Sequence, residues 1–177
     1  MDDLVFDCEA NGLLDEVTEV HCICGVPLAT ADIKPTLYEE SLNRKNVLAL
    51  FSSYNKIIGH NIIGYDIPLI KMFYGIDLIE LKGIENIVDT YVISQVLNPD
   101  RTLPKGCPIS VFNPVTKRIK KIGPHGLESW GYRVGFKKIE VFDWRFFDDN
   151  MLKRCLVDID INKLTYFELM KEAGITP

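Results

Sequence analysis

LVFDCE, from Leu4 to Glu9, is an apolar run interrupted by two acids. Its composition predicts a β-strand, and the turn-forming Asn11-Gly12 follows it. Alternate residues of a strand face the same side, so Asp7 and Glu9 share one face of the predicted sheet. Two carboxylates on such a face need either water at an edge strand or a counterion such as a divalent cation. Taken alone, the pair favours water exposure at an edge.

Short strands and longer helices follow this first strand. The pattern predicts strands over 19–28, 34–38 and 56–60, and helices over 42–51, 65–74, 90–97, 125–134 and 149–172, with Ser41, Asp89 and Asp148 or Asp149 as N-caps. Residues 99–124 are rich in proline and lack clean periodicity, which favours either a mobile loop or a small hairpin. Mixed strands first and helices after predict an α/β or α+β sandwich.

The composition is that of an ordinary globular protein. The 177 residues are enough for a single domain, 1–177, with its own core. The N-terminus has no basic leader and no apolar run reaches about 18 residues, so we expect a cytoplasmic chain with no membrane contact. Cys22 and Cys24 indicate alternate strand positions rather than a zinc site, because structural zinc takes four ligands.

The charge is unevenly distributed. A net charge of −5 argues against a protein that holds nucleic acid by bulk electrostatics alone. Between 105 and 138, however, the only acid is Glu128. The basic residues there are Lys105, Lys117, Arg118, Lys120, Lys121, Arg133, Lys137 and Lys138. We therefore expect a phosphate backbone to lie along this segment.

Two further acids stand out. Asp66 lies at the start of a predicted helix, where capping or the helix dipole would explain it. Asp158 lies in the middle of an amphipathic helix and has no such structural role, whereas Asp160 can point to water. With Asp7 and Glu9 they provide the oxygen ligands that two Mg²⁺ or Mn²⁺ ions prefer. Spacing alone does not prove that the four acids converge.

Four segments of the chain resemble the 3′→5′ proofreading exonuclease domains of phage-type family A DNA polymerases. They occur in the family's order, and the likeness runs from Asp7 to about Leu169. The segments are Asp7-Cys8-Glu9-Ala10-Asn11-Gly12-Leu13-Leu14, His60-Asn61 with Tyr65-Asp66-Ile67-Pro68, Ile87-Val88-Asp89-Thr90, and His125-Gly126-Leu127-Glu128-Ser129-Trp130-Gly131-Tyr132-Arg133.

The resemblance implies a ribonuclease-H-like α/β fold, with a central mixed sheet flanked by helices. It also implies that Asp7, Glu9, Asp66 and Asp158 bind two divalent metal ions, Mg²⁺ or Mn²⁺, with Asp7 bridging both. Asn61 matches an asparagine that would contact the terminal nucleotide. Asp89 matches a family acid, although helix capping explains it equally well. We interpret His60 as a packed residue, and His125 as structural or phosphate-facing.

One position departs from the family pattern. In the tyrosine branch the last motif reads Tyr-x-x-x-Asp, and Arg154 stands where that tyrosine would orient water. Positions 154 and 158 are i and i+4 on the predicted helix, so Arg154 should point into the same site. Arginine cannot act as a general base, but it can bind phosphate or stabilise developing negative charge. Alternatively the metal ions suffice, or Tyr65 or Tyr166 reaches in, or catalysis is lost.

The resemblance predicts an enzyme that removes nucleotides from the 3′ end of single-stranded DNA. Because the chain ends at Pro177, we expect the exonuclease part alone, working freely or with a separate DNA polymerase. An inactive module that binds DNA ends and an RNA 3′-end trimming enzyme are the alternatives. Residues predicted to stack on bases are Leu13, Leu14, Phe112 and Trp130, with core packing an equal alternative for Trp130. We expect Trp144, Phe146 and Phe147 in the core.

Overall fold

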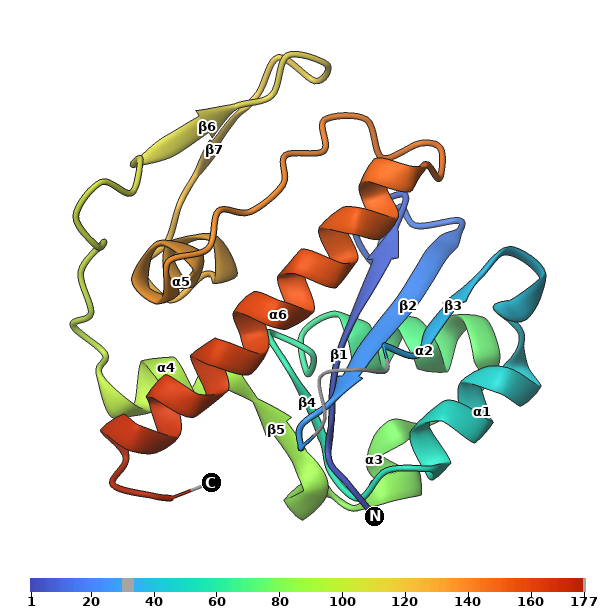
Figure 1. The fold of residues 1–177 in the computed structure, drawn as a ribbon. Helices are drawn as coiled ribbons and strands as arrows, with labels where there is room; N and C mark the ends of the chain where they lie inside the picture. The colour runs from blue at the N-terminus through green and yellow to red at the C-terminus, as the bar shows by residue number, and fades with distance from the viewer. Residues whose placement is uncertain (30–33, 177) are drawn as a thin grey trace.

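The main sheet has five strands in the order β3-β2-β1-β4-β5 (Figure 1). The computed structural model describes residues 1–29 and 34–176. The strands are β1 (Leu4–Ala10), β2 (Val20–Pro27), β3 (Thr36–Tyr38), β4 (Ile57–Gly59) and β5 (Ile87–Asp89). β1 pairs antiparallel with β2 and parallel with β4. The prediction of a mixed sheet flanked by helices is confirmed.

β1 is the central strand, and this corrects the expectation of an edge. Because β1 is hydrogen-bonded on both sides, Asp7 and Glu9 do not lie at a water-exposed edge. Glu9 is only 7% exposed. Alternate residues of β1 serve different cores: Leu4 and Phe6 pack on one face, and Val5 packs on the other. Asp7 and Glu9 share the Val5 face.

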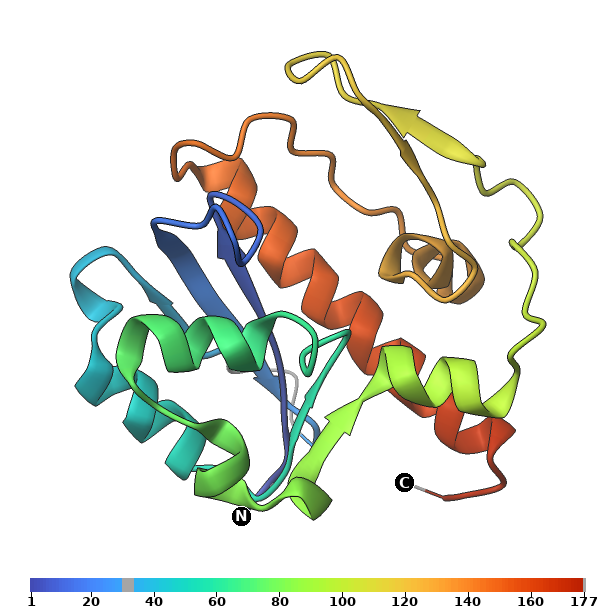
Figure 2. The same cartoon turned by 180° about the vertical axis from the view of Figure 1, so that it is seen from behind.

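The Phe6 face is covered by α1 (Arg44–Ser52), α2 (Asp66–Tyr74) and α3 (Leu78–Lys82) (Figure 2). The Phe6 and Phe51 rings meet edge to face, with centroids 4.9 Å apart. The predicted N-cap of α1 was wrong. Ser41 ends the short helix η1 (Glu39–Ser41), and the Asn43 side chain caps α1 by accepting from the Asn46 backbone N–H. A second short helix, η2, spans Ile84–Asn86.

The opposite face is crossed by the long helix α6 (Asp149–Glu172), which Asp148 caps (Figure 1). α4 (Thr90–Leu97) and α5 (Leu127–Val134) pack against α6 beside the sheet. Asp89 caps α4, as predicted, by accepting from the Tyr91 and Val92 backbone N–H groups. α6 therefore brings its buried side chains over the face of β1 that carries the two acids.

For the proline-containing segment 99–124 the sequence predicted either a mobile loop or a small hairpin. The structure has the hairpin. Its strands are β6 (Ser110–Phe112) and β7 (Ile119–Lys121), which form a separate sheet away from the main one (Figure 2). Residues 135–148 then run without helix or strand from α5 to the start of α6. In the part of the chain that is described, no helix combines the length and apolarity required to cross a membrane.

Aromatic residues near α6 differ in part from the expectation. Trp130 is 2% exposed and packs with Leu127 and Ile161, so its role is in the core. Phe147 packs against the α6 side of the sheet, as predicted. Phe146 is 72% exposed, which corrects its assignment to the core. Phe146 lies in a bend just before Phe147, and only Phe147 packs inward.

Candidate active site

Four buried or half-buried carboxylates converge between β1, α2 and α6. Asp7 and Glu9 come from β1, Asp66 from the first turn of α2 and Asp158 from the middle of α6. Burial raises the pKa of Asp7 well above its ordinary value, and the charges of Glu9, Asp66 and Asp158 raise it further. The four groups are thus close enough to repel one another. The structure brings together all four acids singled out from the sequence.

The acids differ in how they are supported. Burial raises the pKa of Asp66 to about 7, although hydrogen bonding from Cys8 opposes the shift. The Cys8 backbone N–H donates to Asp66 Oδ1 at 3.0 Å, which fixes α2 to β1. Burial also raises the pKa of Glu9 to about 8, and the nearby Arg154 charge acts in the opposite direction. Each carboxylate would be more stable as an anion if a cation were bound.

Two side-chain cations reach into the acid cluster. Lys138 Nζ lies 2.7 Å from Asp158 Oδ2. Arg154 Nε lies 3.2 Å from Glu9 Oε1 and 3.8 Å from Asp158 Oδ2. The Arg154 guanidinium also donates to the Ile139 carbonyl oxygen at 2.6 Å and lies over the Trp144 ring. Arg154 therefore points into the cluster, as its i, i+4 relation to Asp158 predicted.

The donor set fits a hard divalent cation. All four acids offer oxygen ligands, which Mg²⁺ and Mn²⁺ prefer. Asp158 Oδ1 is buried, and no hydrogen-bond donor among the described residues reaches it. A buried carboxylate oxygen without a partner is costly, and a bound cation would remove that cost.

A cavity of about 360 Å³ opens beside these acids. Its lining combines acids, lysines, rings and small residues: Asp7, His60, Asn61, Tyr91, Lys120, Lys121, Ile122, Gly123, Gly126, Leu127, Glu128, Lys138 and Asp158. The lining thus carries acids together with three lysines, and one of these lysines, Lys138, pairs with Asp158. Such a distribution suits a phosphodiester, because its negative charge can lie against the lysines while the acids hold cations.

Asn61 is held in the cavity wall by a strained turn. Its backbone φ is +62°, in the left-handed region. The Asp89 carboxylate accepts from the Asn61 backbone N–H at 2.9 Å and from that of Ile63 at 3.0 Å. A Cβ at Gly59 would lie 2.0 Å from Ile62 Cγ2, so only glycine allows the tight exit from β4. Asp89 thus shapes the loop that presents Asn61, besides capping α4.

His60 and His125 belong to hydrogen-bonded networks. His60 Nδ1 lies 2.9 Å from Thr90 Oγ1, which donates to Asn162 Oδ1 at 2.7 Å. Burial lowers the pKa of His60 to about 3, so its ring is neutral at physiological pH. His125 Nδ1 lies 2.9 Å from Ser94 Oγ. His60 is packed, as expected. His125 was predicted to be structural or phosphate-facing, and its contact with Ser94 supports the structural role.

The predicted nucleic-acid contacts fall into two groups. Lys120 and Lys121 line the cavity, whereas Lys105, Lys117 and Arg118 are exposed on the segment around the hairpin. Leu13 is 68% exposed just beyond β1. Arg133 differs from the others. It donates to the carbonyl oxygens of Pro124 and Thr102 and stacks on Trp130, so its role here is structural.

Tyr65 and Tyr166, the two tyrosines expected to reach into the site, do not line the cavity. The Tyr65 hydroxyl donates to the Gly12 carbonyl oxygen at 2.6 Å, and Tyr166 packs in the core with Val5. Tyr91, on α4, lines the cavity instead. The sequence singled out neither Tyr91 nor the pairing of Lys138 with Asp158. The feature of the sequence that could have pointed to Tyr91 is its position two residues after Asp89, the N-cap of α4.

Comparisons with known proteins agree with this geometry. The chain is 25% identical to the DNA-directed DNA polymerase of Escherichia phage T7 and 26% identical to that of Enterobacteria phage T3. Each alignment covers 98% of this chain and 27% of the polymerase. The chain therefore spans about a quarter of the length of these relatives. No protein-family model matches it.

Solved structures share the fold at low sequence identity. E. coli exonuclease I in complex with a dT13 oligonucleotide superposes with a TM-score of 0.60 at 10% identity, covering 97% of this chain and 41% of that one. The family B DNA polymerase of Pyrobaculum calidifontis gives 0.59 at 13% identity, covering 96% and 24%. The chain has the ribonuclease-H-like fold, and its resemblance to phage DNA polymerases is confirmed.

Proposed function

We propose that the chain is a metal-dependent 3′→5′ exonuclease that releases nucleoside monophosphates from the 3′ end of single-stranded DNA. The observation that carries the proposal is the convergence of four acids beside a lysine-lined cavity. The similarity to two phage DNA polymerases and to a fold seen with bound oligonucleotide supports the same reading.

Asp7, Glu9, Asp66 and Asp158 would hold two divalent ions, Mg²⁺ or Mn²⁺. A metal pair of this kind supplies an activated water and stabilises the leaving 3′ oxygen. Asp7 has neighbours on both sides, with Glu9 on its own strand and Asp66 and Asp158 on separate helices. This central position suits it to share both ions.

The remaining residues would bind and orient the substrate. Lys120 and Lys121 attract the phosphate backbone into the cavity, while Asn61 meets the terminal nucleotide. Leu13, exposed next to β1, packs against a base. Arg154 orients Glu9 through its Nε and places positive charge beside the reacting phosphate. Lys105, Lys117 and Arg118 extend the basic path along the hairpin.

Two other functions make different demands on the same site. A module that only binds DNA ends would not need four mutually repelling acids, so their presence favours catalysis. An RNA-trimming enzyme would need to recognise the 2′-hydroxyl, and the polymerase relatives favour DNA. We further propose that the chain acts in the cytoplasm of a host cell, alone or with a separate DNA polymerase.

The activity is tested with single-stranded DNA labelled at its 5′ end. With Mg²⁺ or Mn²⁺ we expect a ladder shortened from the 3′ end, and with EDTA no digestion. Asp7→Asn should lose at least about 10³-fold in rate while keeping the fold, since one carboxylate that would hold the metal ions is lost and the volume is unchanged. Full activity in Asp7→Asn, or faster digestion of a matched RNA, would contradict the proposal.

Arg154→Ala should lower kcat by about 10²-fold, because a charged donor near the reacting phosphate is lost. Lys153→Ala is the matched control, since Lys153 is the exposed neighbour on α6 and should keep full activity. Arg154→Tyr restores the family residue. If the natural chain is inactive and Arg154→Tyr digests DNA, the role of the natural chain is to bind DNA ends.

Replacing Lys120 and Lys121 together by Met should weaken DNA binding and flatten its salt dependence. Each lost phosphate contact on a single strand reduces the slope of log K against log salt by about 0.7. Fluorescence anisotropy at several salt concentrations measures this slope. Arg44→Met with Lys45→Met is the control, because it removes the same charge from α1 on the other face of the sheet. An equal change in both double variants would place the DNA elsewhere.

The metal-free protein should lose stability as pH rises. The pKa values of Asp66 and Glu9 are raised to about 7 and about 8 in the folded chain. Between their unfolded pKa values near 4 and these folded values, the folded state binds more protons, so rising pH favours unfolding. In EDTA, Tm should therefore fall between about pH 5 and about pH 8, and Mg²⁺ should reduce the fall. A Tm that rises over this range in EDTA would contradict the assignment.

A further inference from the structure

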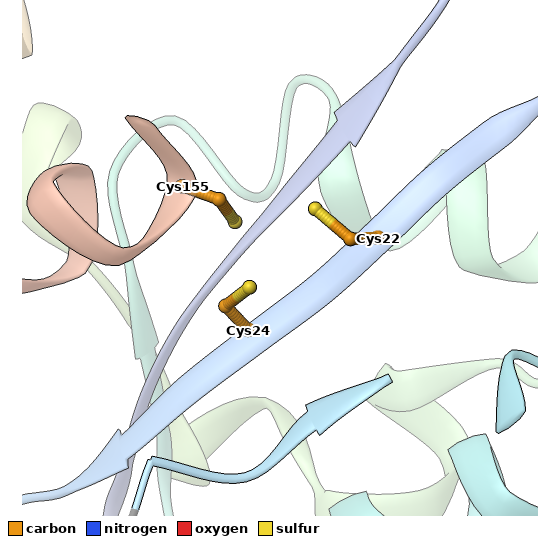
Figure 3. A group of neighbouring side chains, drawn as sticks. All are labelled: Cys22, Cys24 and Cys155. Carbon is orange, nitrogen blue, oxygen red and sulfur yellow. The ribbon is translucent and has the colours of Figure 1, made fainter. Parts of the chain in front are cut away.

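Three thiols meet between β2 and α6, on the face of the sheet that carries Asp7 (Figure 3). Cys22 and Cys24 are alternate residues of β2 and point to the same side. Cys155 lies on α6, and its side chain faces the two cysteines of β2. All three side chains are fully buried, and their Sγ atoms lie within 4.8 Å of one another. Figure 3 shows them pointing toward a common centre.

We propose that Cys22, Cys24 and Cys155 form a binding site for a soft metal ion of the Cu(I) class. Three thiolates around one ion in a plane, each at about 2.3 Å, would have their sulfurs about 4.0 Å apart. The sulfur atoms lie within 4.8 Å of one another, a limit that includes this spacing. Cysteines that served only as small apolar residues would not need their sulfurs to face one another.

The ligand set selects against other ions. A structural zinc site takes four ligands. Among the described residues, Cys22, Cys24 and Cys155 form a group of three sulfur ligands. Mg²⁺ and Mn²⁺ prefer oxygen, whereas soft thiolates prefer Cu(I). The surrounding core is apolar, with Val5, Val26 and Ile159 packed in the same cluster. This shell keeps water and hard ions away from the sulfurs.

The thiol site and the acid cluster adjoin on the same face of the sheet. Cys155 Sγ donates to the backbone carbonyl oxygen of Asp7 at 3.5 Å. Cys155 is also three residues before Asp158 on α6. Cys155 Sγ also lies within 4.8 Å of carboxylate oxygens of Asp7 and Glu9, so the two sites meet at Cys155. The binding proposal does not depend on the nuclease activity.

Anaerobic titration of the full chain with Cu(I), held by a coloured chelator, tests the proposal. We expect one ion per chain. X-ray absorption should show three sulfur neighbours at about 2.3 Å. Cys24→Ser and Cys155→Ser should each weaken binding by at least about tenfold. Cys107→Ser is the matched control, because Cys107 lies outside the cluster and is only partly buried.

Three results would overturn the proposal. One is that the natural chain takes no Cu(I) from the chelator. A second is a coordination shell of two sulfurs, which would exclude the three-thiol site even if a variant failed to fold. The third is equal affinity in the Cys24→Ser and Cys107→Ser variants.

Discussion

Electrostatic repulsion among Asp7, Glu9, Asp66 and Asp158 is the interaction that the surrounding structure has to balance. Burial raises the pKa values of Asp7, Glu9 and Asp66, and the fold tolerates the four carboxylates only where positive charge is available. Two side chains, Lys138 and Arg154, supply part of that charge. The remaining positive charge has to come from ions in solution. We therefore expect the site to bind metal ions, and to bind a phosphate group together with them.

The rigid elements fix the acids, and the less regular segments supply the cations. β1 is held on both sides by neighbouring strands, and α6 is the longest helix, so Asp7 and Asp158 face each other from stable supports. Lys138 and the carbonyl of Ile139, by contrast, lie in the stretch 135–148, which has no helix or strand. Lys120 comes from the small hairpin. The proposed metal ligands thus lie on the main sheet and its helices, and the proposed phosphate contacts lie on smaller or less regular segments.

The sequence predicted most of the acid cluster but not what surrounds it. The alternation in β1 placed Asp7 and Glu9 on one face, and the amphipathic pattern of α6 marked Asp158 as out of place. The family resemblance then joined them to Asp66. No local pattern could show that β1 is central, because strand order depends on long-range pairing. For the same reason the contact of Lys138 with Asp158 and the convergence of three cysteines were not foreseen.

The two-residue alternation of β1 has a consequence for how this protein can change during evolution. Leu4 and Phe6 fill one core, while Val5, Asp7 and Glu9 serve the other side. Deleting one residue within the strand would turn both acids toward Phe51 and push apolar side chains into the metal site. An insertion or deletion in β1 would therefore cost both the core and the acid cluster at once.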